Sequence, residues 1–191
     1  LPRGVAFMDD PSRPRGRASR PFDGEGVRAE PLLLVADGGL HCWILDSRSA
    51  RHLSLESNGR AARGTSSPPQ PSTTNLYLAA GDLSPEALIS DIREGVYITE
   101  MMGSSVSMLT GDYSRGASGF MIRDGQIAEP VAEFTVAGNL NDMFARLIPA
   151  DDLEFRRGTD APTLLIDGLS LSGASARPQL YPVPRGLDPF P

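Results

Sequence analysis

At 191 residues, the chain has the length of one domain and can bury a sizeable core. Its net charge is −6 and all 18 basic residues are arginine, so it lacks the basic surface that neutralises nucleic-acid phosphates. A single cysteine, Cys42, excludes an internal disulfide, and no apolar run approaches the roughly 18 residues of a membrane span.

The first part of the chain is expected to be rich in loops. Residues 1–30 contain several prolines and glycines, which favour turns. Residues 31–46, PLLLVADGGLHCWILD, predict a β-hairpin, because two apolar runs flank a DGG sequence and glycine adopts the positive φ of a tight turn. Residues 64–75, rich in serine, threonine and proline, predict a surface loop or mobile segment. Residues 75–82 predict a short strand.

Residues 83–95, LSPEALISDIREG, carry the clearest helix signals. Ser84 suits the N-cap, and Pro85 suits the first helical position. Glu86 lies in the first turn, where the helix dipole favours an acid. Gly95 predicts the end of this helix.

Strand patterns follow this first helix. Residues 96–102, VYITEMM, and residues 105–110, SVSMLT, each predict a strand. Residues 119–138 predict a second hairpin, which turns at Asp124-Gly125.

A second helix is predicted over residues 139–148, NLNDMFARLI, with Asn139 as its N-cap. One stripe of this helix is apolar, which indicates a side facing the core rather than a ligand site. The stripe consists of Leu140, Met143, Phe144 and Leu147. Residues 162–173, PTLLIDGLSLSG, predict a last pair of strands. Together these elements predict an α+β fold, mainly antiparallel β-sheet in a barrel- or sandwich-like arrangement, with two short helices.

Few side chains suit metal or nucleophilic chemistry. Hydrolytic zinc sites need two or three ligands at fitting spacing, whereas the only histidines are His41 and His52, and neither HExxH nor HExxxH occurs. The GxSxG nucleophile elbow and the lysine-dependent phosphate loop are also absent from the sequence. We therefore expect structural or surface roles for both histidines, and neither metal ligands nor catalytic residues in this chain.

Charged side chains also cluster at several positions in the sequence. The acid pair Asp9-Asp10 predicts a solvated loop. The arginines of residues 13–20, RPRGRASR, also predict a solvated loop, with a local anion-binding site as the alternative. In PFDGEG, Asp23 and Glu25 lie among glycines in a bend. These two acids could cap backbone amides or hold an arginine.

Residues 109–120, LTGDYSRGASGF, place polar side chains between glycines. Asp112 can accept hydrogen bonds from backbone amides. Arg115 can pair with a carboxylate, which could belong to Asp112, to Glu100 or to a peptide terminus. The glycines allow close backbone approach. The residues alone leave two interpretations open, a structural turn and a contact with a ligand or peptide.

Residues 95–144, GVYITEMMGSSVSMLTGDYSRGASGFMIRDGQIAEPVAEFTVAGNLNDMF, resemble the C-terminal domain of the TldD/PmbA family, long labelled modulator of DNA gyrase. The likeness is greatest to the PmbA (TldE) branch. The segments SRPFDGEGV, WILDSRSARHLSLESNGRAARG, SPEALISDIREG and GTDAPTLLIDGLSLSG match in the same order. The resemblance implies one C-terminal domain over residues 1–173 and a proline-rich irregular tail at 174–191. It also implies that the N-terminal half of the protein is missing from this chain.

The resemblance implies a cytosolic zinc metallopeptidase of two subunits, a TldD/TldE heterodimer. The TldD subunit carries zinc on an HExxxH helix in the earlier half of the protein and completes the site with a cysteine of its C-terminal domain, and the PmbA-like subunit lacks these ligands. A further alternative, in which the full-length protein is itself a peptidase, requires an HExxxH motif upstream of this chain. The region that matches this cysteine, residues 154–168, contains none here. We therefore expect a non-catalytic subunit without a cofactor, and zinc in a TldD-like partner.

The implied hydrolase acts on unfolded peptides, in peptide maturation and antitoxin proteolysis. The expected partner is a TldD-like subunit or a second copy of the chain, without direct contact to nucleic acid or membrane. If the domain touches substrate, the candidates are Glu100, Asp112, Tyr113 and Arg115, with a backbone edge pairing an extended peptide as an added strand. Otherwise these residues hold the fold. The alternative function is a peptide-binding or gyrase-modulating protein that acts without a catalytic partner.

Overall fold

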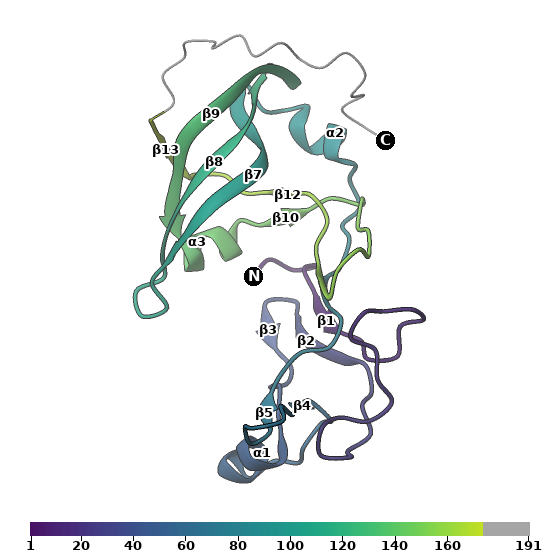
Figure 1. Cartoon of the computed structure of the whole chain (residues 1–191). Coiled ribbons are helices and arrows are strands. Elements are labelled where there is room, and N and C mark those ends of the chain that lie inside the picture. The colour runs from purple at the N-terminus through teal and green to yellow at the C-terminus, as the bar shows by residue number, and fades with distance from the viewer. Residues whose placement is uncertain (174–191) are drawn as a thin grey trace. The chain divides into compact units, whose positions relative to one another are not determined.

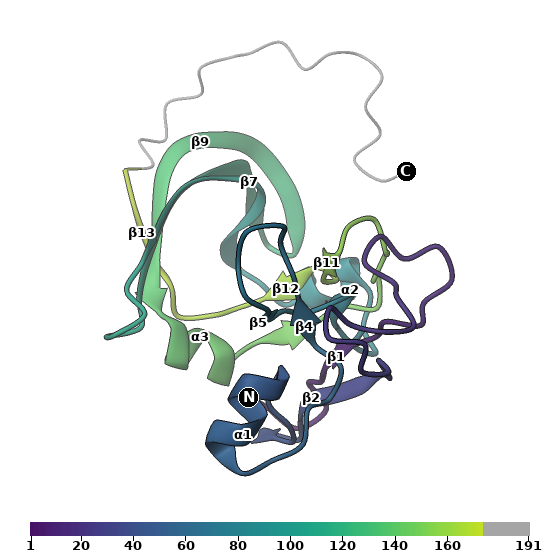
Figure 2. The ribbon, with the colours of Figure 1, turned by 60° about the horizontal axis from the view of Figure 1, so that its bottom comes forward.

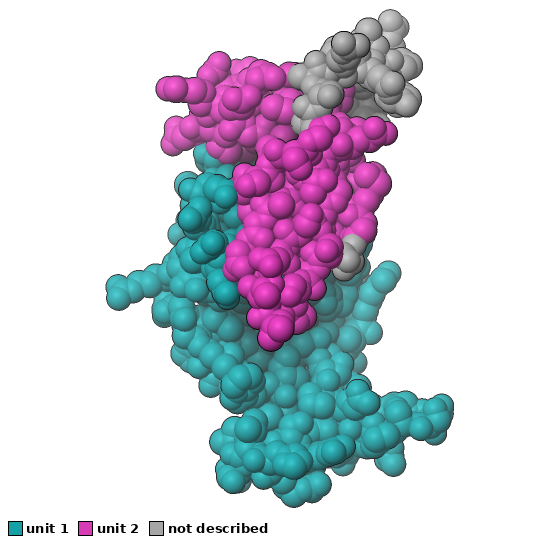
Figure 3. Space-filling view, turned by 90° about the vertical axis from the view of Figure 1, so that its left-hand side faces the viewer, with its two compact units in different colours: residues 1–88, 140–168 teal, residues 89–139, 169–191 magenta. Residues whose placement is uncertain are grey.

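The computed structural model describes residues 1–173, so the tail predicted at 174–191 lies outside the described residues. The chain divides into two compact units (Figure 3). Unit 1 consists of residues 1–88 and 140–168, and unit 2 consists of residues 89–139 together with the chain from residue 169 onward. Short helices and mostly antiparallel sheets confirm the predicted α+β class, although the described residues contain three helices rather than two.

Unit 1 contains a five-stranded sheet with the strand order β11-β6-β1-β2-β3. Strand β6 pairs with β11 in parallel, and the other neighbours are antiparallel (Figure 1). The bounds of these strands are β1 Phe7–Asp9, β2 Leu32–Ala36, β3 Gly39–Leu40, β6 Leu76–Leu78 and β11 Thr159–Asp160. Strand β6 confirms the strand predicted in residues 75–82, whereas β1 lies in a stretch expected to be loop.

The hairpin predicted in residues 31–46 is confirmed by β2 and β3. Its two turn residues have positive φ, 49° at Asp37 and 79° at Gly38, as a type I′ turn requires. The second arm is shorter than predicted, because after Leu40 the chain leaves the sheet and enters helix α1, Ser47–Leu53. This helix was not predicted.

Helix α1 begins at Asp46, whose side chain accepts a hydrogen bond of 2.7 Å from the amide of Ser49. This carboxylate satisfies one of the amides that have no partner within the helix. The helix ends at Ser54, which adopts a left-handed conformation with φ 56°. The Ser54 amide donates to carbonyls of the last turn, so both ends of a seven-residue helix are capped.

Replacing Asp46 with alanine is expected to lower the free energy of unfolding by about 1 kcal/mol at neutral pH. The hydrogen bond from Ser49 lowers the pKa of Asp46. The stabilisation is therefore complete above the ordinary aspartate pKa of about 3.9 and is lost as the pH falls through the lower pKa of the folded state. Urea unfolding at pH 7 and at pH 3 measures the difference. Asp46→Asn keeps a neutral acceptor and should be nearly as stable at pH 7. A difference that does not shrink toward pH 3 contradicts this account.

The helix predicted from Ser84 is α2, Pro85–Ile89, and it is shorter than expected. Ser84 acts as the predicted cap, since its hydroxyl accepts a hydrogen bond of 3.2 Å from the Ala87 amide. The prediction of an end at Gly95 was wrong, because the strand β7 already begins at Glu94.

A buried ion pair, not an apolar side chain, lies at the centre of unit 1. Asp9 and Arg60 are both fully buried, and the Arg60 Nε donates to the Asp9 carboxylate. Asp9 also accepts from the amide and the hydroxyl of Thr74, at 2.7 and 2.9 Å. The Arg60 guanidinium further donates to the carbonyls of Asn58, Gly59, Asp9 and Glu30. The prediction of a solvated loop at Asp9 was therefore wrong.

The segment 64–75 is only partly the surface loop that was predicted. Strand β5, Gln70–Pro71, pairs with β4, Ala61–Ala62, to form a small second sheet. Thr74 is buried and binds the Asp9 carboxylate. The end of this segment is therefore part of the interior of unit 1.

An apolar cluster of Val5, Leu78 and Leu147 completes the interior of unit 1. Leu147 follows helix α3, Leu140–Ala145, and is buried as predicted. The helix itself has no buried residue, and Phe144 is 42% exposed. The prediction that one stripe of this helix faces the core was therefore wrong for the residues within α3.

Unit 2 is built on a four-stranded antiparallel sheet with the order β13-β9-β8-β7. The strands are β7 Glu94–Val106, β8 Asp112–Arg123, β9 Gln126–Asn139 and β13 Ser170–Ser172. The hairpin predicted at Asp124-Gly125 is confirmed, with φ of 47° and 79° at the two turn residues.

The two strands predicted within residues 162–173 exist, but they do not pair with each other. Strand β12, Leu164–Leu165, pairs with β10, Ile148–Pro149, in unit 1. Strand β13 pairs with β9 in unit 2. Gly168 separates them with φ 72°, and the chain changes sheets there.

The sheet of unit 2 is strongly curved, and β9 sweeps through a wide arc in Figure 2. The pairing of β7 with β8 shifts register twice, and so does the pairing of β8 with β9. Such bulges increase the local twist and bend a strand. Ala117, Phe134 and Val136 form the buried cluster on one face of the curved sheet, packed by Val96, Ile98, Val131 and Leu169.

Candidate functional site

The segment 109–120, interpreted from sequence as a turn or ligand loop, is mostly strand. Strand β8 begins at Asp112, so only the residues before it belong to the β7–β8 turn. The SVSMLT strand predicted at 105–110 was also wrong beyond Val106, where β7 ends. Small and polar residues hide the alternation of β8 in the sequence, because the face of Ala117 carries Tyr113 and Arg115 at positions where apolar side chains would mark the core.

The β7–β8 turn is held by hydrogen bonds around Asp112. Its carboxylate accepts from the Thr110 hydroxyl at 2.7 Å and from the Asn139 side-chain amide at 3.5 Å. Asn139 also donates to the Thr110 carbonyl at 2.9 Å, and Gly111 adopts φ 79°. Asp112 therefore has a defined structural role in this turn.

Two large apolar side chains stand exposed on this ordered turn. Met108 is 89% exposed and Leu109 is 96% exposed, and the turn extends beyond the strands in Figure 1. Exposed apolar side chains on a rigid turn often mark a contact with another molecule.

The four candidate residues lie on two faces of the sheet. Side chains alternate along a strand, so Tyr113 and Arg115 share the face of Ala117, whereas Asp112 lies on the opposite face. Glu100 pairs with Ser118 and lies on that opposite face too. The structure brings Tyr113 and Arg115 together, and it does not gather all four candidates into one site.

Arg115 has no acidic partner among residues 1–173, unlike several other arginines. Its Nε is buried and has no hydrogen-bond acceptor. The side chain as a whole is half-buried, beside Val136 across the strand pair. The pairs with Asp112 or Glu100 that the sequence left open do not form, because those carboxylates lie on the other face.

Tyr113 is the neighbour of Arg115 on this face. Its hydroxyl lies 3.3 Å from the Met101 Sδ, and a thioether is only a weak acceptor. The Tyr113 hydroxyl is therefore available to a stronger acceptor.

The bend at PFDGEG caps backbone amides, as one of the two interpretations predicted. Asp23 is buried and accepts from the amides of Glu25, Val27 and Ala61, each at 2.9 Å. Glu25 accepts from the Ser47 amide at 2.8 Å, at the start of α1. These acids therefore stabilise the fold of unit 1.

The arginine-rich segment 13–20 is not merely solvated. The Arg13 guanidinium lies 3.1 Å from the centroid of the Phe155 ring, and Phe155 contacts Tyr77 edge to face at 5.1 Å. Cation–π contacts of this kind hold a loop against its neighbours. The Arg20 side chain has a buried Nε and a buried Nη2 without acceptors among the described residues.

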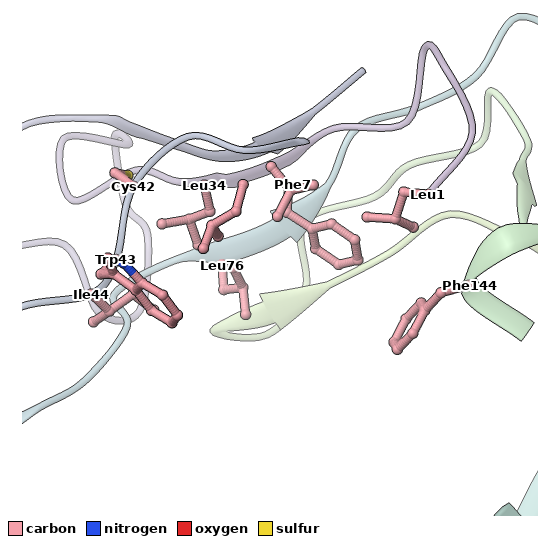
Figure 4. Close-up of a pocket in the computed structure, with 10 residues that line it drawn as sticks. Leu1, Phe7, Leu34, Cys42, Trp43, Ile44, Leu76 and Phe144 are labelled. Atoms are coloured by element: carbon pink, nitrogen blue, oxygen red, sulfur yellow. The ribbon is translucent and has the colours of Figure 1, made fainter. Parts of the chain in front are cut away.

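Unit 1 also has an apolar pocket of ≈ 520 Å³ (Figure 4). Aliphatic and aromatic side chains line it, including Leu1, Phe7, Leu34, Trp43, Leu76 and Phe144. Cys42 lies at the same wall and donates to the Leu33 carbonyl at 3.2 Å, and burial raises the pKa of its thiol. A thiol with a raised pKa is a poor nucleophile at neutral pH.

The described residues do not fit a zinc site of their own. His41 and His52 are exposed. Within residues 1–173, no three side chains of histidine, cysteine, aspartate or glutamate gather closely enough to hold a metal ion. None of the helices in the described part of the chain is long and apolar enough to cross a membrane.

The amino-acid sequence is similar to known proteins over most of its length. Residues 1–173 match the family model of the PmbA/TldA metallopeptidase C-terminal domain. The metalloprotease PmbA of Escherichia coli O157:H7 is 38% identical over 174 residues, which cover 91% of this chain and 37% of that protein. A metalloprotease TldD homolog of Haemophilus influenzae is 26% identical over 186 residues, covering 88% of this chain and 39% of that protein.

A solved structure from Thermotoga maritima, a proposed modulator of a DNA gyrase, has the same fold. The two structures match with a TM-score of 0.76 at 30% sequence identity. The match covers 88% of the present chain and 39% of the Thermotoga maritima chain. The present chain therefore spans less than half the length of the relatives that it matches.

Proposed function

Because the chain belongs to the PmbA/TldD metallopeptidase family through its C-terminal domain, we propose that it is part of a PmbA/TldE-like subunit. In this proposal the subunit pairs with a TldD-like catalytic subunit in the cytoplasm, and the pair trims or degrades unfolded peptides. The zinc ion belongs to the TldD-like partner. The present chain supplies binding surface and no catalytic group.

The observation that carries the proposal is the difference in similarity to the two branches. Identity is 38% to the relative named PmbA and 26% to the relative named TldD homolog. The region that would carry the additional TldD-type cysteine has none. This feature supports the PmbA side of the family for this chain.

The edge of the curved sheet suits an extended peptide. Strand β7 is an outer strand of the four-stranded sheet, so among the described residues one of its edges has no neighbouring strand. Residues 99–103 and 105–106 are exposed along it. A free edge of this kind can accept an unfolded peptide as an added strand through backbone hydrogen bonds, largely independent of peptide sequence.

The four candidates then divide their roles within the proposal. Tyr113 and Arg115 contact the peptide from the Ala117 face, and Glu100 contacts it from the other face. Asp112 holds the β7–β8 turn in the conformation that presents Met108 and Leu109. This turn contributes to the contact with the TldD-like subunit.

Zinc content and peptide hydrolysis of the full-length protein, alone and mixed with a TldD-like subunit of the same cell, test the proposal. We expect hydrolysis only in the mixture, with zinc in the partner. The matched control is the TldD-like subunit alone at the same concentration. Zinc and full activity in the PmbA-like protein by itself would overturn the assignment of the catalytic role.

A second function is favoured by the name of the Thermotoga maritima relative, a proposed modulator of a DNA gyrase. In that case the protein binds a peptide or protein without hydrolysis and needs no catalytic partner. The same mixing experiment separates the two functions, because this protein alone would bind its ligand and the mixture would not cut it. The net charge of −6 argues against direct contact with DNA.

A further inference from the structure

Arg115 is a charged group in the middle of a sheet face that offers it no anion. Across the strand pair it faces Val136, and two residues further along β8 the same face carries the fully buried Ala117. Its Nε is enclosed and lacks an acceptor within residues 1–173. Leaving a buried donor without a partner costs free energy, and a charged donor costs more than a neutral one.

Arg123 on the same strand, in contrast, has acidic hydrogen-bond partners for its guanidinium. Its guanidinium donates to Glu129 at 2.7 Å and to Glu94 at 3.4 Å, on the neighbouring strands β9 and β7. The hydrogen bonds that Arg123 donates to Glu129 raise the pKa of Arg123. Arg115 has no such acids at the positions across from it, because β9 presents Val136 and β7 presents methionines nearby.

The surroundings of Arg115 nevertheless provide a second donor. Tyr113 lies two residues earlier on the same face, at a spacing of about 7 Å along the strand. Among the described residues, its hydroxyl meets only the Met101 thioether, at 3.3 Å. A planar guanidinium and a phenol beside an apolar floor form a suitable arrangement for a carboxylate, which accepts two or more hydrogen bonds.

We propose that Arg115, with Tyr113, binds a carboxylate of the peptide that the protein handles. This inference rests on the proposed function and adds the chemical group of the peptide substrate that the site recognises. The carboxylate can be the C-terminus of the peptide or an acidic side chain. Arg115 is thus a specificity-determining residue, whereas the backbone edge of β7 binds peptides irrespective of sequence.

The test measures binding of three fluorescein-labelled peptides of twelve glycine, serine and leucine residues. The first ends in a free carboxylate, the second ends in an amide, and the third ends in an amide but carries one central aspartate. Fluorescence anisotropy is recorded with the full-length protein mixed with its TldD-like subunit and EDTA, so that no peptide is cut. We expect a peptide carboxylate to tighten binding roughly tenfold over the neutral peptide, the usual scale of a charge-assisted pair.

Variants assign the preference to Arg115. Arg115→Gln should remove the difference between the acid and amide peptides, whatever its effect on the binding of the amide peptide itself. Arg115→Lys should restore only part of it, because lysine lacks the planar fork. Tyr113→Phe should reduce it by a smaller factor. Arg123→Gln is the matched control on the same strand, and it should keep the full preference.

The outcomes separate this inference from the proposed function. Equal binding of all three peptides to the wild-type protein overturns the inference, even where zinc-dependent hydrolysis by the mixture stands. A preference that survives in Arg115→Gln overturns it as well. A carboxylate preference that depends on Arg115, in a mixture that cuts nothing after zinc is restored, supports the inference and removes the peptidase role. Comparing the peptide with a free C-terminus and the peptide with a central aspartate against the neutral amide peptide identifies whether Arg115 binds a terminal or a side-chain carboxylate.

Discussion

Replacing Arg60 with methionine is expected to destabilise the protein by about 3–5 kcal/mol, the usual cost of removing one partner from a buried ion pair. Arg60 and Asp9 are both fully buried. Without the guanidinium, the Asp9 carboxylate keeps only its hydrogen bonds from Thr74 and remains as an uncompensated charge in the interior. The carbonyls of Glu30 and Asn58 lose their donor at the same time.

Equilibrium urea unfolding, followed by circular dichroism, measures this loss. Arg63→Met is the matched control, because Arg63 lies three residues further along the chain and is exposed. Its replacement should change the free energy of unfolding by less than about 0.5 kcal/mol. The double variant Asp9→Leu with Arg60→Met should lose less than the sum of the single variants, since neither charge is then left alone. A loss below about 1 kcal/mol in Arg60→Met would show that the interior is open to water.

Replacing Gly119 with alanine is expected to cost about 2 kcal/mol or more, because an added methyl group in a tightly packed place forces the backbone to move. A Cβ on Gly119 would clash with the carbonyl oxygen of Tyr97 and would lie 3.0 Å from the Ile98 Cα. Both groups belong to the backbone of β7, which cannot rotate away as a side chain can. The position lies where the pairing of β7 with β8 shifts register.

Gly116→Ala is the matched control on the same strand. Its Cβ would meet Met102 atoms at 3.7 Å, an ordinary van der Waals distance. Because alanine restricts the unfolded chain more than glycine does, this variant should be neutral or slightly more stable. Urea unfolding compares the two variants, and hydrogen exchange of the β7 amides shows whether the strand has shifted. Equal stability of Gly119→Ala and Gly116→Ala contradicts the proposed close approach of the two strands.

Both hairpin turns could be predicted from sequence because their determinants are local. Asp37-Gly38 and Asp124-Gly125 each supply two residues that tolerate positive φ between apolar runs. The cap at Ser84 is equally local, since the hydroxyl needs to reach only the amide of Ala87. Such features depend on neighbours within a few positions, which the sequence displays directly.

The interior of unit 1 could not be predicted in this way. Asp9 and Arg60 are 51 positions apart, and nothing near Asp9 in the sequence distinguishes it from the half-buried Asp10. Helix α1 was missed because its N-cap, Asp46, was assigned to the end of a hairpin arm. Its capping pattern, an aspartate followed by Ser-Arg-Ser, is the sequence signal for this helix.

The sequence indicated which residues are candidates for the site, but it did not indicate how they are arranged on the sheet. The sequence indicated Tyr113, Arg115, Asp112 and Glu100, but it could not assign them to faces, because a single register shift moves a side chain to the other side of a sheet. Bulges in the curved sheet decide those positions.

The amino-acid sequence by itself determined the α+β class, the two hairpin turns, the α2 cap and the family resemblance, since each is written in short stretches of residues. Only the tertiary structure decided that Asp9 is buried against Arg60 and that Phe144 is exposed. It also decided that strands β12 and β13 join different sheets, and that within residues 1–173 Arg115 is left without an acid while Arg123 has two. These features depend on which distant segments meet, and the burial and charge of a side chain follow from that meeting rather than from its neighbours in the chain.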